Sequence, residues 1–279
     1  MQAIRIETVN DPRVLDFQDI PDPVRLRELG SFVAEGRFAV RSLLLSDNIL
    51  ECKLLVTDSA LEGLADSLKE SSRSVLVYVA SRDLLRQIGG YDFHQGCLGL
   101  AVRPEPREVG YVLSVSMPFR PLVILERIGD PDNLGGIFRN AAAFGAGGVL
   151  LSPGCCDPLY RKAVRTSIAT TLQIPYAVVN EWPNGLIALR DCGYTLVALT
   201  PKNTALELHR YRLPEGSSGA AFLLGNEGDG LTAAAMSLAD CRVRIPLETI
   251  VDSLNVATAS GLALYHARGL RDHAELRGV

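Results

Sequence analysis

The sequence predicts an α/β protein built from two units, the second of which is organised around a parallel sheet. Along most of the 279 residues, short apolar or β-branched runs alternate with stretches of helical periodicity. Residues 103–108 combine two prolines with charged side chains, interrupt this alternation and are typical of a linker. Beyond them the apolar runs recur with helical stretches between them, which is the pattern of parallel strands joined by crossover helices.

The elements follow in order along the chain. In the first unit we expect strands at 54–57, 75–80 and 97–102, and helices at 23–37, 60–70 and 82–87. In the second unit we expect strands at 122–125, 148–151, 176–179, 195–200, 221–224 and 243–247, and a last helix, rich in alanine and leucine, at 253–270. The predicted division is an N-terminal extension (1–20), a smaller first domain (21–105), a linker (106–118) and a second domain (119–279).

Composition narrows the class of protein. Hydrophobic residues make up 47% and charged residues 22%, which are ordinary values for a globular chain. No apolar run reaches membrane-spanning length and the start of the chain lacks the apolar core of a secretory signal, so we expect a cytoplasmic protein without membrane contact. The six cysteines and four histidines show no metal-ligand spacing, which predicts reduced thiols and no metal. A net charge of −4 means that any nucleic-acid contact must use local patches.

The segment 132–145 carries the first chemical signal. It joins a predicted strand to a helix whose start holds two glycines, and it contains Asn133 and Arg139. An arginine near a helix start is well placed for a phosphate or carboxylate, since helix N-terminal N–H groups already favour negative charge. A plain strand-to-helix turn with a solvated arginine is the alternative.

Two further loops follow predicted strands of the second unit. Residues 224–231 are rich in glycine and contain Glu227, and residues 245–257 contain Ser253 and Asn255. In parallel α/β sheets the ligand binds beyond the carboxyl ends of the strands, so these loops are expected to meet segment 132–145 there. None of them is a G-x-G-x-x-G or P-loop pattern, so a dinucleotide or a nucleoside triphosphate is not indicated.

Together the three loops resemble the three motifs of the SpoU/TrmH family of knotted methyltransferases. The first motif matches Asn133, Gly135, Arg139, Ala141, Phe144 and Gly145. The second matches Leu224, Gly225, Glu227, Gly230 and Leu231. The third matches Ile245, Pro246, Ser253, Leu254, Asn255 and Val256. The segment from Asp157 to Ser167 is similar to the family's connector between the first two motifs.

Two positions depart from the family pattern. Leu247 stands where the family usually has methionine, which is a swap of similar volume. Thr249 stands where glycine is usual, and a β-branched residue resists the positive φ angles that glycine permits. The loop or the cofactor pocket is therefore expected to be reshaped here.

The resemblance implies a fold and an activity. The second domain would be a parallel-sheet α/β domain with a trefoil knot, and residues 21–105 would be a smaller α/β domain that resembles ribosomal proteins and binds substrate RNA. The reaction would transfer a methyl group from S-adenosyl-L-methionine to a ribose 2′-hydroxyl of RNA. Ribosomal RNA is preferred over transfer RNA, because the extra N-terminal domain resembles that of ribosomal RNA enzymes. The protein would be a homodimer.

The resemblance also assigns residues. Arg139, Asn133, Glu227, Ser253 and Asn255 would form the catalytic set. Arg139 would hold RNA phosphate and stabilise charge on the reacting oxygen, since arginine stays protonated and is a poor base. The cofactor would be bound by Thr200, Gly225, Ile245, Leu247 and Leu254, and RNA by Arg161, Lys162 and Arg165.

Each of these residues also has a purely structural interpretation. Arg139 would pair with Glu227, and Asn133 would cap its own helix. Ser253 and Asn255 would cap the last helix, and the cofactor set would be ordinary core or turn residues. The basic stretch 161–165 would be a solvated helix face.

Three functions remain open on the sequence. The first is the RNA 2′-O-ribose methyltransferase, acting on ribosomal RNA or, alternatively, on transfer RNA. The second is a non-catalytic RNA-binding or ribosome-assembly protein on the same fold. The third is an unrelated α/β enzyme that acts on a small anionic metabolite.

Overall fold

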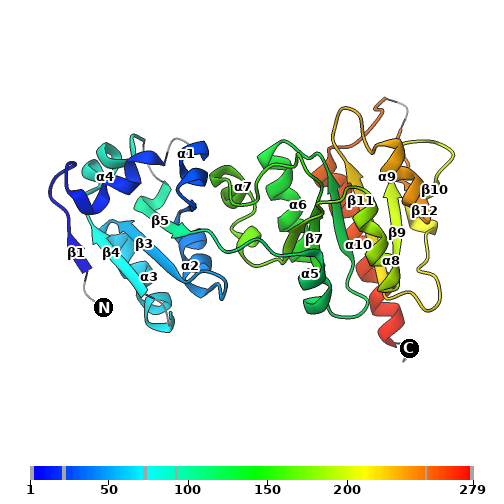
Figure 1. Ribbon diagram of the computed structural model, residues 1–279, viewed down its shortest axis with the longest axis horizontal. Helices are drawn as coiled ribbons and strands as arrows, with labels where there is room; N and C mark the ends of the chain where they lie inside the picture. Colours follow the sequence, from blue (N-terminus) through cyan, green and yellow to red (C-terminus); the bar gives the residue numbers. More distant parts are fainter. Residues whose placement is uncertain (1–2, 21–22, 72–73, 92–93, 249, 277–279) are drawn as a thin grey trace. The chain divides into compact units, whose positions relative to one another are not determined.

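The computed structural model describes residues 3–20, 23–71, 74–91, 94–248 and 250–276 (Figure 1). The chain divides into two compact units. Unit 1 comprises residues 1–105 together with 158–173, and unit 2 comprises residues 106–157 and 174–279. Each unit has its own sheet and its own apolar core.

Unit 1 is built on a five-stranded mixed sheet in the order β1-β4-β3-β5-β2. Its strands are β1 (Ala3–Arg5), β2 (Ser31–Glu35), β3 (Glu51–Val56), β4 (Ser74–Val79) and β5 (Cys97–Val102). Its α-helices are α1 (Pro23–Glu28), α2 (Arg37–Leu45), α3 (Asp58–Glu70), α4 (Arg82–Gly89) and α7 (Arg161–Thr166), with short 3-10 helices at Pro12–Asp19, His94–Gly96 and Thr170–Leu172. The pairs β1–β4 and β3–β4 are parallel, whereas β5 runs antiparallel to both β3 and β2.

The expected helix at 23–37 is wrong in its second half. The chain forms α1 and then β2, which pairs antiparallel with β5. Phe32, Val33 and Ala34 are all buried between Gly30 and Gly36, both of which adopt positive φ angles. A short apolar run between two glycines is a strand signal that the helical periodicity of the preceding residues obscured.

The segment 1–20 is part of unit 1 and not an extension to it. β1 pairs with β4, and Val14, Phe17 and Ile20 are fully buried with the residues of β3 and β5 on one side of the sheet. Asp11 caps the 3-10 helix that carries these side chains by accepting a hydrogen bond from the Arg13 backbone N–H at 3.0 Å.

Residues 158–173 also belong to unit 1, so a continuous second domain at 119–279 is wrong. Leu159, Val164, Ala169 and Leu172 are buried in the same apolar cluster as the residues of α2, β3 and β5. Sequence order alone places this segment between two strands of unit 2, and only the three-dimensional packing assigns it to unit 1.

Unit 2 is built on a seven-stranded sheet in the order β10-β12-β9-β11-β6-β7-β8. The strands are β6 (Leu122–Glu126), β7 (Gly148–Leu151), β8 (Tyr176–Val178), β9 (Tyr194–Leu199), β10 (Leu206–Glu207), β11 (Gly219–Gly225) and β12 (Cys241–Arg244). Every strand pair in this sheet is parallel, so the parallel α/β fold is confirmed. The knot that the family resemblance implies stays a prediction.

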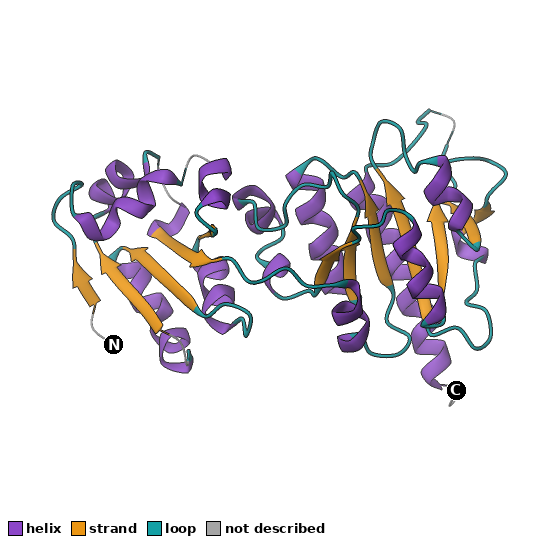
Figure 2. Cartoon of the chain, viewed as in Figure 1, coloured by secondary structure: helices purple, strands orange, loops and turns teal. Residues whose placement is uncertain are grey.

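Helices cover both faces of the unit 2 sheet. They are α5 (Val109–Val115), α6 (Pro131–Phe144), α8 (Ile187–Asp191), α9 (Ala233–Leu238) and α10 (Val256–Leu276), with 3-10 turns at Asn184–Leu186 and Leu208–Arg210. Val112 of α5, Leu189 of α8 and Ala235 of α9 share one apolar cluster with the sheet. Figure 2 shows α8 in front of the strands and α10 behind them, where α10 packs along α6.

The expected linker at 106–118 is only partly a linker. Residues 103–108 have no regular structure, but α5 begins at Val109, and Val112 is fully buried against β7 and β8. No helix in the described ranges is long and apolar enough to cross a bilayer.

Candidate functional site

Helix α6 holds the first motif, and its ends are defined by the sequence around it. Asp130 caps the start by accepting a hydrogen bond from the Asp132 backbone N–H at 2.8 Å, and Pro131 occupies the first turn. Gly145 ends the helix with a φ of 72°. Asn133 therefore does not cap its own helix, because Asp130 has that role.

Gly135 and Gly136 both lie inside the helix, and Gly136 serves packing. A Cβ atom on Gly136 would lie 3.0 Å from the Cβ of Ala257 in α10. Asn140, one turn further on, donates to the Ala257 carbonyl at 2.7 Å. The absence of a side chain at Gly136 therefore allows a close approach of α10 to α6.

Asn133 connects the three motifs. Its side-chain Nδ2 donates to Glu227 Oε1 in the second motif. Its Oδ1 accepts from Asn255 Nδ2 in the third motif at 2.7 Å. Segments more than 90 residues apart in the sequence therefore meet at a single amide.

Asn255 has two roles at once. Its Oδ1 accepts from the backbone N–H groups of Ala257 at 2.9 Å and Thr258 at 3.2 Å, which caps the first turn of α10. Its Nδ2 remains available for Asn133. The structural and the functional interpretations of Asn255 are therefore compatible.

Arg139 is exposed and, within the described part of the chain, makes no hydrogen bond or ion pair. The alternative that it pairs with Glu227 is not what the structure has, since Glu227 is bonded to Asn133. An exposed guanidinium without a partner is available for a ligand phosphate or carboxylate.

The loop 225–231 is folded by Asn226. Its Oδ1 accepts from the backbone N–H groups of Gly228 at 3.1 Å and Asp229 at 2.8 Å, and its carbonyl accepts from Gly230 at 3.1 Å. Gly225 closes the loop, because a Cβ there would lie 2.1 Å from the Gly230 carbonyl carbon. The glycine at 225 is a steric requirement of this turn.

A cavity of about 750 Å³ lies at the carboxyl ends of β9, β11 and β12. This volume is in the range of small-molecule sites. The cavity lies where parallel sheets bind ligands, and every residue that the sequence assigned to the cofactor lines it: Thr200, Gly225, Ile245, Leu247 and Leu254.

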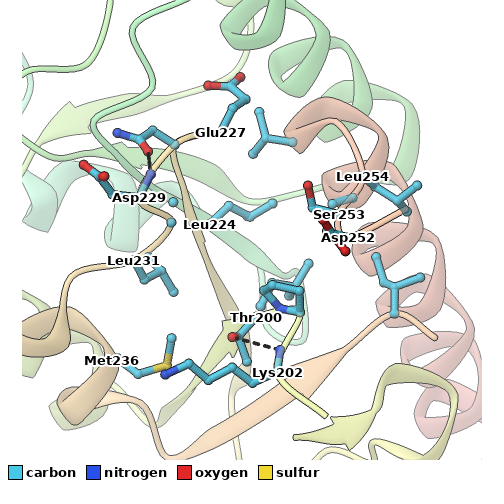
Figure 3. Close-up of a pocket in the computed structure, with 18 of the residues that line it drawn as sticks. Thr200, Lys202, Leu224, Glu227, Asp229, Leu231, Met236, Asp252, Ser253 and Leu254 are labelled. Carbon is cyan, nitrogen blue, oxygen red and sulfur yellow. Dashed lines mark hydrogen bonds between the residues drawn. The ribbon is translucent and has the colours of Figure 1, made fainter. Parts of the chain in front are cut away.

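The walls differ in character around the cavity. Figure 3 shows Thr200 and Lys202 near one another, with Ser253 and Leu254 on a different wall. Leu224, Leu231 and Met236 supply apolar surface, and Glu227, Asp229 and Asp252 are the acidic residues of the lining. Ser253 is exposed and lies ahead of α10, which begins at Val256, and Thr249 lies outside the described residues.

The basic stretch 161–165 lies in unit 1 and is partly engaged there. The Arg161 guanidinium lies 3.6 Å from the carboxylate of buried Glu35 and 4.4 Å from the centre of the Tyr91 ring. Burial is the main cause that raises the pKa of Tyr91 to about 12. Arg161 therefore has a packing role in its unit, and Arg165, which is exposed, is the more accessible cation.

Sequence reasoning missed Lys202, Met236, Arg242 and Asp252 as lining residues. It also missed Glu126, the buried last residue of β6. A charged residue that ends a wholly apolar strand was the available signal for Glu126. No such signal was available for the four lining residues, because they lie outside the family motifs or between the positions that the motifs specify.

Comparison with known proteins decides the family. The profile of the SpoU rRNA Methylase family matches residues 120–265. A tRNA/rRNA methyltransferase of Mycobacterium bovis, itself uncharacterised, is 40% identical over 92% of this chain and 88% of its own length. The chain belongs to the SpoU family.

Two further methyltransferases extend the likeness over both units. The 23S rRNA (guanosine(2553)-2′-O)-methyltransferase RlmP of Bacillus subtilis is 27% identical over 95% of this chain and 99% of its own. The AdoMet-bound rRNA methyltransferase from Sinorhizobium meliloti has a TM-score of 0.78 and 26% identity, covering 96% of this chain and 98% of that one. The present chain is accordingly an RNA methyltransferase that uses S-adenosyl-L-methionine.

The cavity fits this cofactor. The backbone N–H groups of Leu247 and Leu254 donate to no other group among the described residues, so they can bind the acceptor nitrogens of an adenine ring. The apolar walls suit the ring faces, and the lining carboxylates suit the positive charges of a sulfonium and an ammonium group. The donor set therefore matches the chemistry of S-adenosyl-L-methionine.

Proposed function

We propose that this SpoU protein transfers a methyl group from S-adenosyl-L-methionine to a ribose 2′-hydroxyl of RNA, in ribosomal RNA in preference to transfer RNA. The observation that carries the proposal is the convergence of the three motifs at Asn133, beside a cavity lined by the second and third of them. Relatives named as 23S rRNA 2′-O-methyltransferases, from Bacillus subtilis and Neisseria meningitidis, support the ribose position and the ribosomal substrate.

The bound cofactor supplies an activated methyl group on a sulfonium centre. The work of the protein is to position the hydroxyl and to favour loss of its proton. Asn133 holds Glu227 through one hydrogen bond and is itself held by Asn255. This leaves the second carboxylate oxygen of Glu227 for the substrate, and Ser253 lines the same cavity.

Arg139 is assigned to the RNA and to the charge that develops on the reacting oxygen. Its guanidinium is exposed and stays protonated, so it acts by electrostatic stabilisation and not as a proton acceptor. Arg165, together with Lys162 and the partly engaged Arg161, is assigned to RNA phosphates, and unit 1 as a whole to substrate RNA binding.

The same proposal includes a cytoplasmic homodimer with a trefoil knot in unit 2. Leu262 and Tyr265 on α10 are 41% and 68% exposed and lie one turn apart, which leaves apolar surface for a second copy. The non-catalytic alternative is not favoured, since the catalytic set is complete in this chain.

The decisive experiment replaces Arg139. In Arg139→Ala, methyl transfer at saturating RNA is expected to fall about a hundredfold or more, the loss typical of removing one group that stabilises charge in the transition state. S-adenosyl-L-methionine affinity, measured by calorimetry, should stay close to that of the native protein, because Arg139 does not line the cavity. Arg210→Ala, at an exposed arginine of unit 2 that does not line the cavity, is the matched control and should keep its turnover. Near-normal transfer by Arg139→Ala would contradict the assignment.

A further inference from the structure

Glu126 is a buried carboxylate that the proposed chemistry does not use. It ends β6, is 1% exposed and accepts three hydrogen bonds. Trp182 Nε1 donates to Oε1 at 2.7 Å, Thr232 Oγ1 donates to Oε1 at 2.8 Å, and the Thr232 backbone N–H donates to Oε2 at 2.8 Å. A buried carboxylate is costly unless such bonds compensate it, so this residue is an element of structure with a defined set of partners.

Two of the three bonds go to the residue that follows the loop 225–231. Thr232 is also the cap of α9, since its Oγ1 accepts from the Ala235 N–H at 3.2 Å. The hydroxyl therefore donates to Glu126 and accepts from the helix at the same time. Glu126 thus fixes where the loop ends and where α9 begins.

The start of the loop lies beside the same residue. In the pairing of β11 with β6, Gly225 is the register partner of Glu126. Both ends of the loop are consequently held at the last residue of β6, one by the strand ladder and the other by the carboxylate. Between these ends, Glu227 reaches Asn133 and the remaining residues line the cavity.

The neighbouring contact is weaker. Arg127 Nη2 lies 3.5 Å from Asp229 Oδ2, but these side chains are 42% and 77% exposed. Exposed ion pairs contribute little, whereas hydrogen bonds to a buried charge are among the strong ones. Glu126 is therefore the main anchor of the loop on β6.

We propose that Glu126 is a positioning residue for methyl transfer: through Thr232 it holds the loop 225–231 in the arrangement that binds the cofactor and presents Glu227. This inference rests on the proposed function for its kinetic consequence, but the anchoring itself is a property of the free protein. The two can therefore be tested separately.

The test compares Glu126→Gln with Trp182→Phe. All three partners of Glu126 donate, so the NH₂ group of a glutamine must face an N–H donor whichever way the amide is turned. Trp182→Phe removes one donor and leaves both bonds to Thr232. It is the matched control for simple loss of a bond at this carboxylate.

Amide hydrogen exchange of the ligand-free proteins measures directly how firmly Glu126 holds the loop. In Glu126→Gln the amides of Thr232, Gly230 and Asp229 should exchange at least about tenfold faster than in the native protein, since a lost bond to a buried charge corresponds to one or two powers of ten. In Trp182→Phe they should exchange at the native rate. Equal exchange in all three proteins, or equal acceleration in both variants, overturns the proposal.

Cofactor affinity and turnover measure the functional consequence of the anchoring by Glu126. Glu126→Gln should bind S-adenosyl-L-methionine about tenfold or more weakly, and kcat should stay low when the cofactor is saturating, because Glu227 is misplaced. Trp182→Phe should keep both quantities even if its thermal midpoint falls. If Glu126→Gln does not fold, Thr232→Val replaces it. This variant keeps the backbone bond to Glu126 but loses the hydroxyl bond and the cap of α9, so the amides of Gly230 and Asp229 should exchange faster than in the native protein by a smaller factor, and their exchange at the native rate would overturn the proposal.

The two failures are distinguishable. Equal amide exchange of the loop 225–231 in the native protein and both variants overturns the anchoring role of Glu126, whatever their methyl-transfer rates are. A native protein that binds the cofactor but methylates no RNA overturns the proposed function and leaves the exchange result standing.

Discussion

Gly225 shows how a single residue determines the cavity. It is the last residue of β11 and faces Gly230 across the loop, where the backbone forms an isolated bridge between Asn226 and Gly230. A Cβ at 225 would lie 2.1 to 2.4 Å from three backbone atoms of residues 230 and 231, and backbone cannot move aside as a flexible side chain can. The family motif requires glycine here for a steric reason.

Gly225→Ala is therefore expected to open the loop and abolish detectable S-adenosyl-L-methionine binding in calorimetry. Gly228→Ala is the matched control within the same loop. A Cβ there meets only Asn226 Oδ1, at an ordinary 3.7 Å, and the residue does not need a positive φ angle. Native-like cofactor affinity in Gly225→Ala would show that the loop is not closed as described.

At the scale of single residues, the sequence predicted which residues belong to the site better than it predicted the contacts between them. Asn133, Glu227 and Asn255 were named from their motifs, but the bonds between them depend on the approach of three distant segments. Glu126 was missed because a glutamate after an apolar strand is usually solvated. Only the positions of Trp182 and Thr232 reveal that it is buried and bonded.

Helix α10 connects the third motif to α6. It carries the Asn255 cap at its start and packs along α6 through Ala257 and Ser260, both of which bond to Asn140. Further along, His266 lies against Tyr211 and its Nε2 is 3.1 Å from the Tyr211 carbonyl oxygen.

The titration of His266 should make the stability of unit 2 depend on pH. Burial is the main cause that lowers the pKa of His266 below its ordinary 6.5, with the charges of Arg212 and His209 acting in the same direction. The unfolded chain therefore binds the proton more readily, so the stabilisation is present above pH 6.5 and is lost as the pH falls through the folded pKa.

Urea unfolding between pH 7.5 and pH 5 measures this dependence. The free energy of unfolding of the native protein should fall with pH more steeply than that of His266→Phe. His94→Asn, at a histidine of unit 1, should follow the native slope. Identical slopes for the native protein and His266→Phe would refute the role of His266.

The elements themselves were predicted with uneven success, for physical reasons. Each expected strand of unit 2 overlaps an observed one, since strands buried on both faces of a parallel sheet are continuous apolar runs. The last is displaced, because β12 ends at Arg244 and not at residue 247. β2 was hidden in a helical pattern, and β10 is two residues long, too short for any periodicity.

For the whole molecule, the exposed face of α10 predicts the state of assembly. Tyr265 makes an edge contact with Phe144 of α6, with ring centres 5.9 Å apart, yet it is 68% exposed. A paired aromatic that remains open to water on a helix with a neighbouring exposed leucine is typical of an interface.

Sedimentation velocity is expected to show a dimer of the native protein. Tyr265→Lys should shift it to monomer, because a charge would be buried without a partner in the interface. Leu50→Lys, at a leucine that is 76% exposed in unit 1, should leave the dimer intact. A dimer that survives Tyr265→Lys would place the interface elsewhere.

The segment 158–173 has a consequence for how the protein matures. The ribosome synthesises residues 1–105 before it makes Leu159, Val164 and Leu172, and these complete the core of unit 1. Unit 1 therefore cannot be complete before synthesis of unit 2 begins, in contrast to the usual order, in which an N-terminal domain folds before the next one is made. Two strands of unit 2, β6 and β7, emerge while unit 1 is still incomplete. The synthesis of the two units is therefore interleaved. When the nascent chain ends at residue 105, the apolar face of unit 1 that residues 158–173 will cover is still open to a chaperone.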